Sequence, residues 1–445
     1  MVVTSQSQNE LKRQLGLGAA TALVIGEVIA VGIFLTPAGM AKSLGSPMWL
    51  LIVWLIMGMM ALSGALCYGE LAARFPEAGG GYVYLREAYG QRLAFLYGWK
   101  SLLVMDPGIT AALAVGLASY VGYLIKLSPI GIKAVAIGSI VLIAIVNILG
   151  VRFGARLMQI VTALKLGSLA LIVVWAVVFR LGDFSNFTPF VAQRNGSDPL
   201  AGALAGAMVA AFFSFGGWWD LSKLTGEVED PSRSLPRALA LGVIGVTLVY
   251  ILTSLVFIYL VPLERVTTGE TFAAQAGEAL FGQAGGQIFS IIVIVSVLGS
   301  LAALMLAAPR VYYAMARDGL FFNSVAMVHP RFGTPARAIA LQALLASLLV
   351  AIGTFDQIIA YFIFVTVFFI ALTVTAVFVL HRRDHDKTTY RTAFYPLTPL
   401  FFLTLVTLLL ILLAGNSPKQ ALLGIAVVAL GAPIYHLLFN KRRLL

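Results

Sequence analysis

Two apolar segments carry glycines and polar side chains where a membrane helix would run unbroken. The first segment, residues 24–34, holds Glu27 between glycines, and the second, residues 212–220, holds the pair Gly216-Gly217. Unwound backbone at membrane depth is tolerated only where it is buried in protein or lines a cavity. Breaks in corresponding helices of two halves are typical of secondary transporters. The two segments therefore predict one small-molecule site.

The first break offers groups of both charges. Unwinding frees backbone N–H and C=O groups, and the half-helix that starts near Gly32 directs the positive end of its dipole at the break, which favours a carboxylate. Close glycine packing between helices is the alternative explanation. Glu27 favours the site, because a carboxylate inside a membrane is costly and usually functional. The candidates here are Gly26, Glu27, Ala30, Val31 and Gly32.

The second break has the sequence Ser214-Phe-Gly-Gly-Trp-Trp-Asp220. Its glycines allow backbone torsions that a helix forbids. The rings of Phe215, Trp218 and Trp219 would line or cover a pocket. An interfacial aromatic belt is the alternative, but these rings lie well inside a span that begins near residue 200. We therefore assign them to the pocket.

Two further charges are expected at membrane depth. Lys165 follows the start of its span by about nine residues, which is roughly 13 Å and close to the middle of a ~30 Å hydrocarbon core. Unless it snorkels, it must pair with oxygen atoms or lose its proton, so it would replace a sodium ion or carry a coupling proton. Asp106, followed by Pro107, is either a partner for Lys165 or Glu27 or a cap at a helix kink.

Composition restricts the class of protein. The 445 residues are 60% hydrophobic and 11% charged, which is about half the charged share of soluble proteins. Long apolar runs favour an all-α membrane protein over a barrel. The net charge of +11 is not interleaved with aromatic residues, so no nucleic acid is expected. Because Cys67 is the only cysteine and no nucleophile–base pair is evident, we predict no metal site, no cofactor and no enzyme activity.

The apolar runs predict about twelve membrane spans. They lie near residues 16–40, 47–73, 93–124, 130–149, 156–180, 200–226, 236–261, 284–316, 336–354, 357–380, 396–414 and 419–438. The breaks fall in spans 1 and 6, which predicts a five-plus-five inverted repeat. The repeats would be residues 16–180 and 200–380, followed by two helices within 396–438, with tails at 1–15 and 439–445.

Lysines and arginines gather in alternate loops, on the side that holds both termini. The bias toward basic cytoplasmic loops predicts that both termini are cytoplasmic. Lys100, Lys223 and Arg310 are counted with this cytoplasmic group. The sequence thus predicts a multi-pass protein of the inner membrane, in contact with the lipid bilayer.

Several separated segments together resemble the amino acid–polyamine–organocation superfamily, in the style of its L-type and bacterial amino-acid permeases. The matching segments are Ala30-Val-Gly-Ile-Phe34 with Pro37, the loop at 76–90, Phe213-Ser-Phe-Gly-Gly-Trp218, Thr225-Gly-Glu227, Glu229-Asp-Pro231 with Leu235-Pro236, and the end of span 8 at 309–319. The resemblance covers residues 15–320, and the combination of motifs is specific.

The resemblance implies a sodium-independent secondary transporter of L-amino acids that works by alternating access, as an exchanger or with protons as coupling ion. It implies a substrate carboxylate near the N–H groups of Val31, Gly32 and Ile33, and an amino group near the carbonyls of Gly26, Phe213, Ser214 and Gly216. An aromatic gate would be Phe215 or Trp218. Lys165 resembles a lysine of the sodium-independent members.

Two departures from the family pattern affect the expected substrate. Ala30-Val31 is bulkier than the usual pair of small residues, and Glu27 stands where relatives carry a small or neutral polar residue. Glu27 would accept a substrate amine, pair with Lys165 or carry a proton. The first option predicts a transporter of cationic amino acids or polyamines. A non-transporting amino-acid sensor of the same fold is the other alternative, which solute flux would decide. Trp219 would make the pocket smaller.

Overall fold

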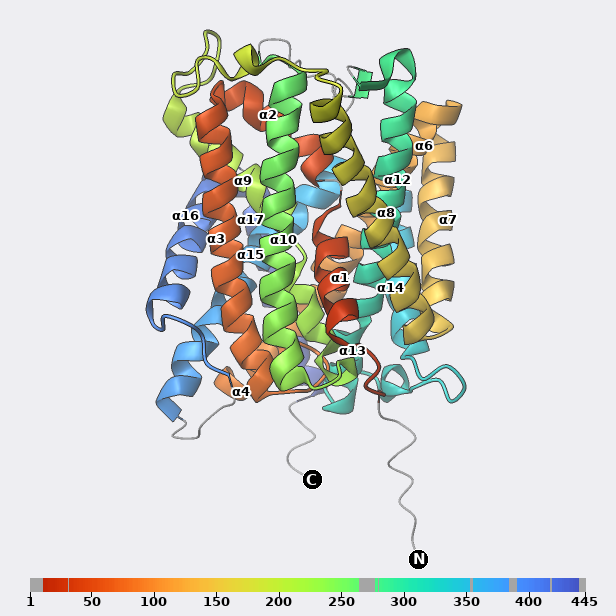
Figure 1. The fold of residues 1–445 in the computed structure, drawn as a ribbon. Helices are drawn as coiled ribbons and strands as arrows, with labels where there is room; N and C mark the ends of the chain where they lie inside the picture. Colours follow the sequence, from red (N-terminus) through yellow and green to blue (C-terminus); the bar gives the residue numbers. More distant parts are fainter. Residues whose placement is uncertain are drawn as a thin grey trace, which may run out of the picture.

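The computed structural model describes residues 11–30, 32–263, 277–278, 280–352, 355–383, 390–416 and 418–439. Over these ranges the chain is almost entirely helical and contains no strand; one isolated bridge pairs Leu15 with Val228. Figure 1 shows an upright bundle whose described chain begins and ends at the same end. The all-α prediction is confirmed.

The helices follow one another with short connections. They are α1 (Leu17–Val28), α2 (Gly32–Leu44), α3 (Pro47–Arg74), α4 (Gly81–Tyr89), α5 (Gln91–Lys100), η2 (Ser101–Met105), α6 (Asp106–Ile125), α7 (Pro129–Ile148), α8 (Val151–Val178), η3 (Phe184–Phe187), α9 (Leu200–Phe215), η4 (Trp218–Glu227), α10 (Pro231–Leu260), η6 (Gly282–Ala284), α12 (Gly285–Ala307), α13 (Pro309–Arg317), η7 (Asn323–Ala326), α14 (Ala336–Ile352), α15 (Phe355–Arg383), α16 (Leu397–Asn416) and α17 (Pro418–Leu438).

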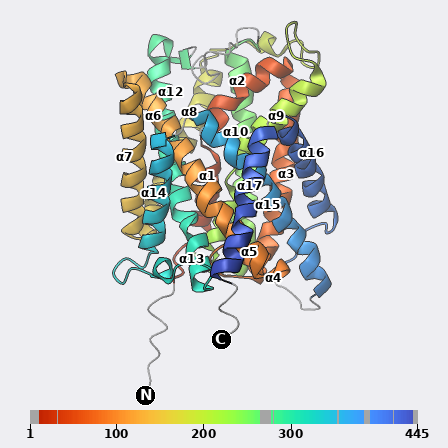
Figure 2. The same ribbon diagram turned by 180° about the vertical axis from the view of Figure 1, so that it is seen from behind.

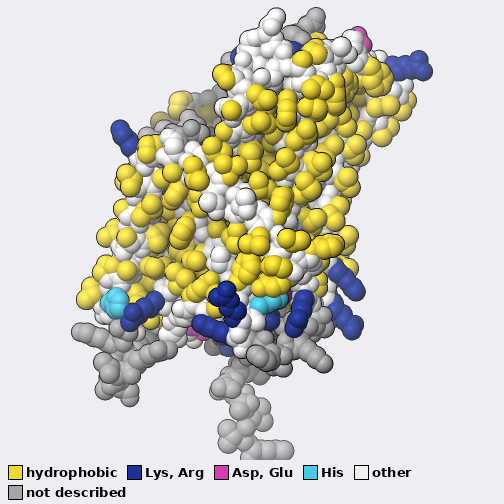
Figure 3. All heavy atoms as spheres, turned by 90° about the vertical axis from the view of Figure 1, so that its left-hand side faces the viewer, with side chains coloured by type: hydrophobic (Ala, Val, Ile, Leu, Met, Phe, Trp, Pro, Cys, Tyr) yellow, Lys and Arg dark blue, Asp and Glu magenta, His cyan; other side chains and the backbone are white. Residues whose placement is uncertain are grey.

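Ten helical segments of the described chain are long and apolar enough to cross a membrane. The predicted first and ninth spans are shorter apolar helices, Leu17–Val28 and Ala336–Ile352. The first is short because its span divides into α1 and α2. Figure 3 shows hydrophobic side chains over the middle of one face, with Lys and Arg toward its two ends. The chain is therefore a multi-pass membrane protein.

Both predicted breaks are present. Helix α1 ends at Val28 and α2 begins at Gly32, while α9 ends at Phe215 and a 3₁₀ segment, η4, begins at Trp218. Gly217 between α9 and η4 has φ 109°, in the left-handed region where glycine is favoured. The second break thus requires a glycine at this position.

The two broken spans lie beside each other and run in opposite directions. Helix α2 packs against α9 and α1 packs against η4, and Figure 1 shows α1 below α2. The contact between α2 and α9 is close: a Cβ atom on Gly32 would lie 2.7 Å from the Cα of Ser214. The hydroxyls of Thr36 and Ser214 are hydrogen-bonded over 2.8 Å at the same crossing.

Unbroken helices surround this pair. Helices α8, α10 and α12 pack against α1, and α3 packs against α9 and η4. The rear view shows α17 and α15 on the side away from α10 (Figure 2). A π-helical turn, η2, joins α5 to α6, so that the third span changes its helical register next to Asp106.

Candidate functional site

A pocket lies where the two breaks meet, with walls from α1, α2, α6, α9, η4, α12 and α15. Its space, mouth included, is about 840 Å³. The residues of the predicted site that line it are Glu27, Ala30, Gly32, Phe213, Ser214, Gly216 and Trp219. The pocket thus combines backbone ends and side chains from both breaks.

The other predicted residues of the breaks do not line the pocket. Ile33 and Phe215 are buried in the core, and Trp218 packs edge-on against neighbouring aromatic rings. Gly26 contributes only its carbonyl oxygen to a nearby cluster. Val31 lies outside the described residues.

Lys165 on α8 lies against the end of α1. Its Nζ donates to the carbonyl oxygen of Gly26 over 2.8 Å and to that of Ile29, and it lies 3.3 Å from the hydroxyl of Ser300. Ser300 also donates to the Gly26 oxygen over 2.7 Å. The last carbonyls of a helix lack helical partners and carry partial negative charge, so the buried ammonium satisfies them. Lys165 is 1% exposed.

Tyr250 on α10 connects the two breaks. Its hydroxyl lies 2.9 Å from the carbonyl oxygen of Val28 and 2.7 Å from that of Ser214. One hydroxyl has one proton to donate, so the two carbonyls share it. A side chain outside both broken spans therefore holds the end of α1 beside the end of α9.

Glu27 is the acidic group of the first break, and it faces η4. It lines the pocket, is 6% exposed, and its Oε2 has no hydrogen-bond partner among the described residues. A Cβ atom on Gly217 would lie 2.9 Å from Cγ of Glu27, so the glycine also makes room for the carboxylate. Asp220 of η4 lines the same pocket. Two acidic side chains thus border one cavity.

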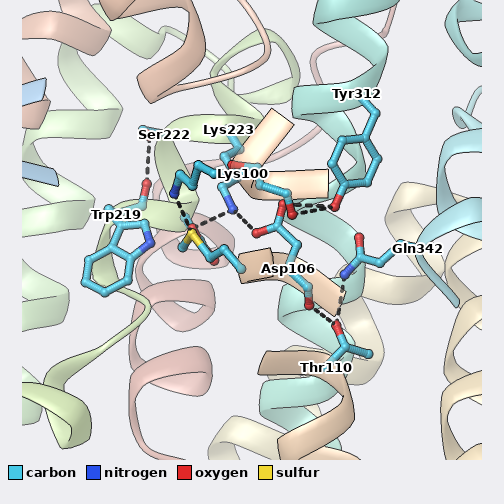
Figure 4. Close-up of polar contacts among 11 residues, drawn as sticks. Lys100, Asp106, Thr110, Trp219, Ser222, Lys223, Tyr312 and Gln342 are labelled. Atoms are coloured by element: carbon cyan, nitrogen blue, oxygen red, sulfur yellow. Dashed lines mark hydrogen bonds and ion pairs between the residues drawn. The ribbon is translucent and has the colours of Figure 1, made fainter. Parts of the chain in front are cut away.

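A buried charge cluster lies next to the pocket (Figure 4). Nζ of Lys223 lies 3.0 Å from Oδ1 of Asp106 and 2.9 Å from Oδ1 of Asp220; the second contact is an ion pair without hydrogen-bond geometry. The hydroxyl of Tyr312 donates to Oδ2 of Asp106 over 3.0 Å. The structure therefore places Asp106 with Lys223, where the sequence suggested Lys165 or Glu27 as its partner.

Three basic residues that the sequence placed at the cytoplasmic surface are buried. Besides Lys223, these are Lys100 and Arg310, which are 1% and 0% exposed. Nζ of Lys100 lies 2.8 Å from the sulfur of Met105 and 4.5 Å from the ring centre of Tyr97. Arg310 forms a two-point ion pair with Glu227, with N–O distances of 2.7 and 3.2 Å. Charge counting along the chain misplaced these residues because helices α5, η4 and α13 continue into the bundle.

A second cluster lies at the end of the bundle where α4 meets α13. Arg86 pairs with Asp318 over 2.7 Å and with Glu77 over 2.9 Å. Tyr82 donates to the same Asp318 over 2.7 Å. Burial, and then the negative charge of Asp318, raise the pKa of the Tyr82 hydroxyl. The loop that resembled the family's first cytoplasmic loop is therefore fixed to the end of the eighth span.

Several residues of the pocket and its surroundings escaped the sequence analysis. Apolar walls come from α6 and α9, through Ile109, Leu113 and Phe212. No local pattern marks them, because any span supplies such residues. Asp220 and Lys223 did carry a signal: opposite charges three residues apart inside an apolar span share one helix face.

Comparison with known proteins gives matches along nearly the whole chain. A family profile described as amino acid permease matches residues 15–431. The serine/threonine exchanger SteT of Bacillus subtilis is 33% identical over 438 residues, which are 96% of this chain and 97% of that protein. The large neutral amino acids transporter small subunit 2 of Rattus norvegicus is 31% identical, over 96% of this chain and 81% of that protein. The human cystine/glutamate transporter is 27% identical, over 97% and 86%.

Proposed function

The chain belongs to the amino acid permease family, and we propose that it exchanges L-amino acids across the cytoplasmic membrane by alternating access. The observation that carries this proposal is the pocket between two broken helices of opposite direction. One relative is by name a serine/threonine exchanger and another a transporter of large neutral amino acids. These names support amino acids as the substrate class, exchange as the mode, and transport in place of catalysis.

The pocket suits a zwitterion. Helix α2 begins at Gly32 in the pocket wall, and the first N–H groups of a helix lack intrahelical acceptors and face outward with the positive end of the dipole. The α-carboxylate of the substrate binds at this end. The substrate side chain lies along Ile109, Leu113 and Phe212, which are apolar and line the same space.

Sodium is not required in this proposal. Sodium ions in transporters of this architecture bind at freed carbonyls and the C-terminal ends of half-helices. Here the ammonium of Lys165 already contacts two such carbonyls of α1 and the Ser300 hydroxyl. Its fixed positive charge supports transport without a sodium ion.

The membrane arrangement is part of the proposal. Lys and Arg gather at the end of the bundle where the described chain starts and finishes, which supports cytoplasmic termini. The two five-helix repeats, residues 16–180 and 200–380, would rock against each other, with the helices of 396–438 outside them. Lys223 of η4 and Asp106 of α6 belong to different repeats, so their contact is one that such a motion would change.

The test uses purified protein in liposomes. Uptake of labelled L-alanine, L-leucine and L-arginine is followed with and without unlabelled amino acid inside, with sodium replaced by choline, and with an inward proton gradient. Uptake that requires internal amino acid and is unchanged in choline is expected. Uptake driven by the proton gradient into empty liposomes would show a proton symporter instead. Binding without flux under every condition would show a sensor and overturn the proposal.

A further inference from the structure

We propose that Glu27 and Asp220 form a subsite for the positively charged end of a substrate side chain, so that this transporter selects cationic L-amino acids. The inference rests on the proposed function and specifies its substrate class. Both carboxylates line the pocket, and Oε2 of Glu27 lacks a partner among the described residues. A buried carboxylate without a partner is costly, and a cationic ligand removes that cost.

The charges around the pocket do not balance without a ligand. Three carboxylates, those of Glu27, Asp106 and Asp220, lie in or next to it. Among the described residues, the ammonium of Lys223 is the cation in ion-pair contact with this group, and it is shared by the two aspartates. Its charge is therefore already compensated, and Glu27 is left to the contents of the pocket.

The two other buried lysines are directed elsewhere. The ammonium of Lys100 faces the sulfur of Met105 and the ring of Tyr97, as Figure 4 shows for its contact with the sulfur. The ammonium of Lys165 contacts carbonyls at the end of α1. Neither forms an ion pair with Glu27 in the structure.

Aromatic rings complete the subsite. Trp219 lines the pocket and stacks on Phe212, with ring centres 6.4 Å apart and planes 21° apart. The face of a tryptophan attracts an ammonium or guanidinium group. An aromatic wall with two carboxylates is suited to a cation at the end of an aliphatic chain.

The position of the subsite indicates the side chain and not the α-amino group. The α-carboxylate is expected at Gly32, where α2 packs against α9, whereas Asp220 lies on η4, which packs against α1. The two ends of the pocket therefore belong to different halves of the broken spans. A lysine or arginine side chain would extend from one to the other.

The first test needs no variant. Exchange in liposomes is compared for pairs of similar shape that differ in charge: L-arginine with L-citrulline, and L-lysine with L-norleucine. We expect the cationic member to be exchanged with at least tenfold higher kcat/KM in each pair. Preference for the neutral members would overturn the subsite while leaving amino-acid exchange intact. No exchange of any amino acid would instead overturn the proposed function.

Variants then locate the selectivity. Glu27→Gln and Asp220→Asn should each lower the arginine-to-citrulline ratio of kcat/KM at least tenfold, chiefly through KM for arginine. Glu229→Gln, at an exposed carboxylate away from the pocket, is the control and should keep the ratio. An unchanged ratio in both pocket variants would overturn the proposal. If a variant does not fold, thermal stabilisation of the wild type by arginine but not by citrulline gives the same decision, and equal stabilisation by both counts against the subsite.

Discussion

The ammonium of Lys165 lies 2.8 Å from the carbonyl oxygen of Gly26, which belongs to a helix 139 residues earlier in the chain. The contact ties the fifth span to the unwound end of the first. A helix that stops inside a membrane leaves carbonyls without water or helical partners, and each must find a donor. Lys165 supplies donors and a positive charge at once, which makes it a structural part of the break.

Replacing this lysine should therefore remove exchange. Lys165→Ala leaves the carbonyls of Gly26 and Ile29 with only the hydroxyl of Ser300 nearby, and we expect the exchange rate to fall at least tenfold. The free energy of unfolding should decrease by roughly 1–3 kcal/mol for the unsatisfied groups. Exchange in liposomes and thermal unfolding in detergent measure the two effects. Lys42→Ala, at an exposed lysine, is the control; wild-type exchange in Lys165→Ala would refute the role.

Local signals in the sequence were enough to locate the breaks. Glycines beside Glu27 and before Trp218 mark interruptions because they act within a few residues of the chain. The depth of Lys165 could also be read, since a helix advances by a constant rise per residue. The prediction of an all-α membrane fold with two interrupted helices is accordingly confirmed.

Pairing across the bundle could not be read in the same way. Lys223 and Asp106 are 117 residues apart, and their contact depends on how η4 and α6 pack. Counting charges placed Lys223 in a loop because polar residues surround it on the C-terminal side. Trp218 was expected to be a gate, but it packs into the core because η4 turns its ring toward Tyr68.

The hydroxyl shared between the breaks gives a second prediction. Tyr250→Phe removes the one proton that Val28 and Ser214 share and keeps the ring, which packs against Trp54. The free energy of unfolding should fall by about 1–3 kcal/mol, because a buried carbonyl loses its donor. Thermal unfolding measures this change. Tyr123→Phe, at an exposed tyrosine, should melt like the wild type, and equal melting of the two variants would argue against the bridge.

The glycine of the second break gives a third prediction. Gly217→Ala imposes a side chain where φ is 109° and where its Cβ would lie 2.9 Å from Glu27. We expect loss of stability by more than about 1 kcal/mol and loss of exchange. Gly202→Ala on α9 is the matched control, because a Cβ there meets nothing within 4 Å and alanine favours the helix. The control should be as stable as the wild type or more so, and a harmless Gly217→Ala would contradict the geometry.

The buried charge cluster gives a fourth prediction, which concerns the order of two effects. Lys223→Met leaves the carboxylates of Asp106 and Asp220 buried without their common cation, whereas Asp106→Asn leaves Lys223 with Asp220. Removing one partner of a buried pair typically lowers stability by about 3–5 kcal/mol, so the lysine variant should approach this loss and the aspartate variant should lose less. Combining Lys223→Met with Asp106→Asn should recover part of the loss, because one uncompensated carboxylate is then neutral. Thermal unfolding of the three variants measures the order. Equal losses in the two single variants would mean that Asp220 does not share the lysine.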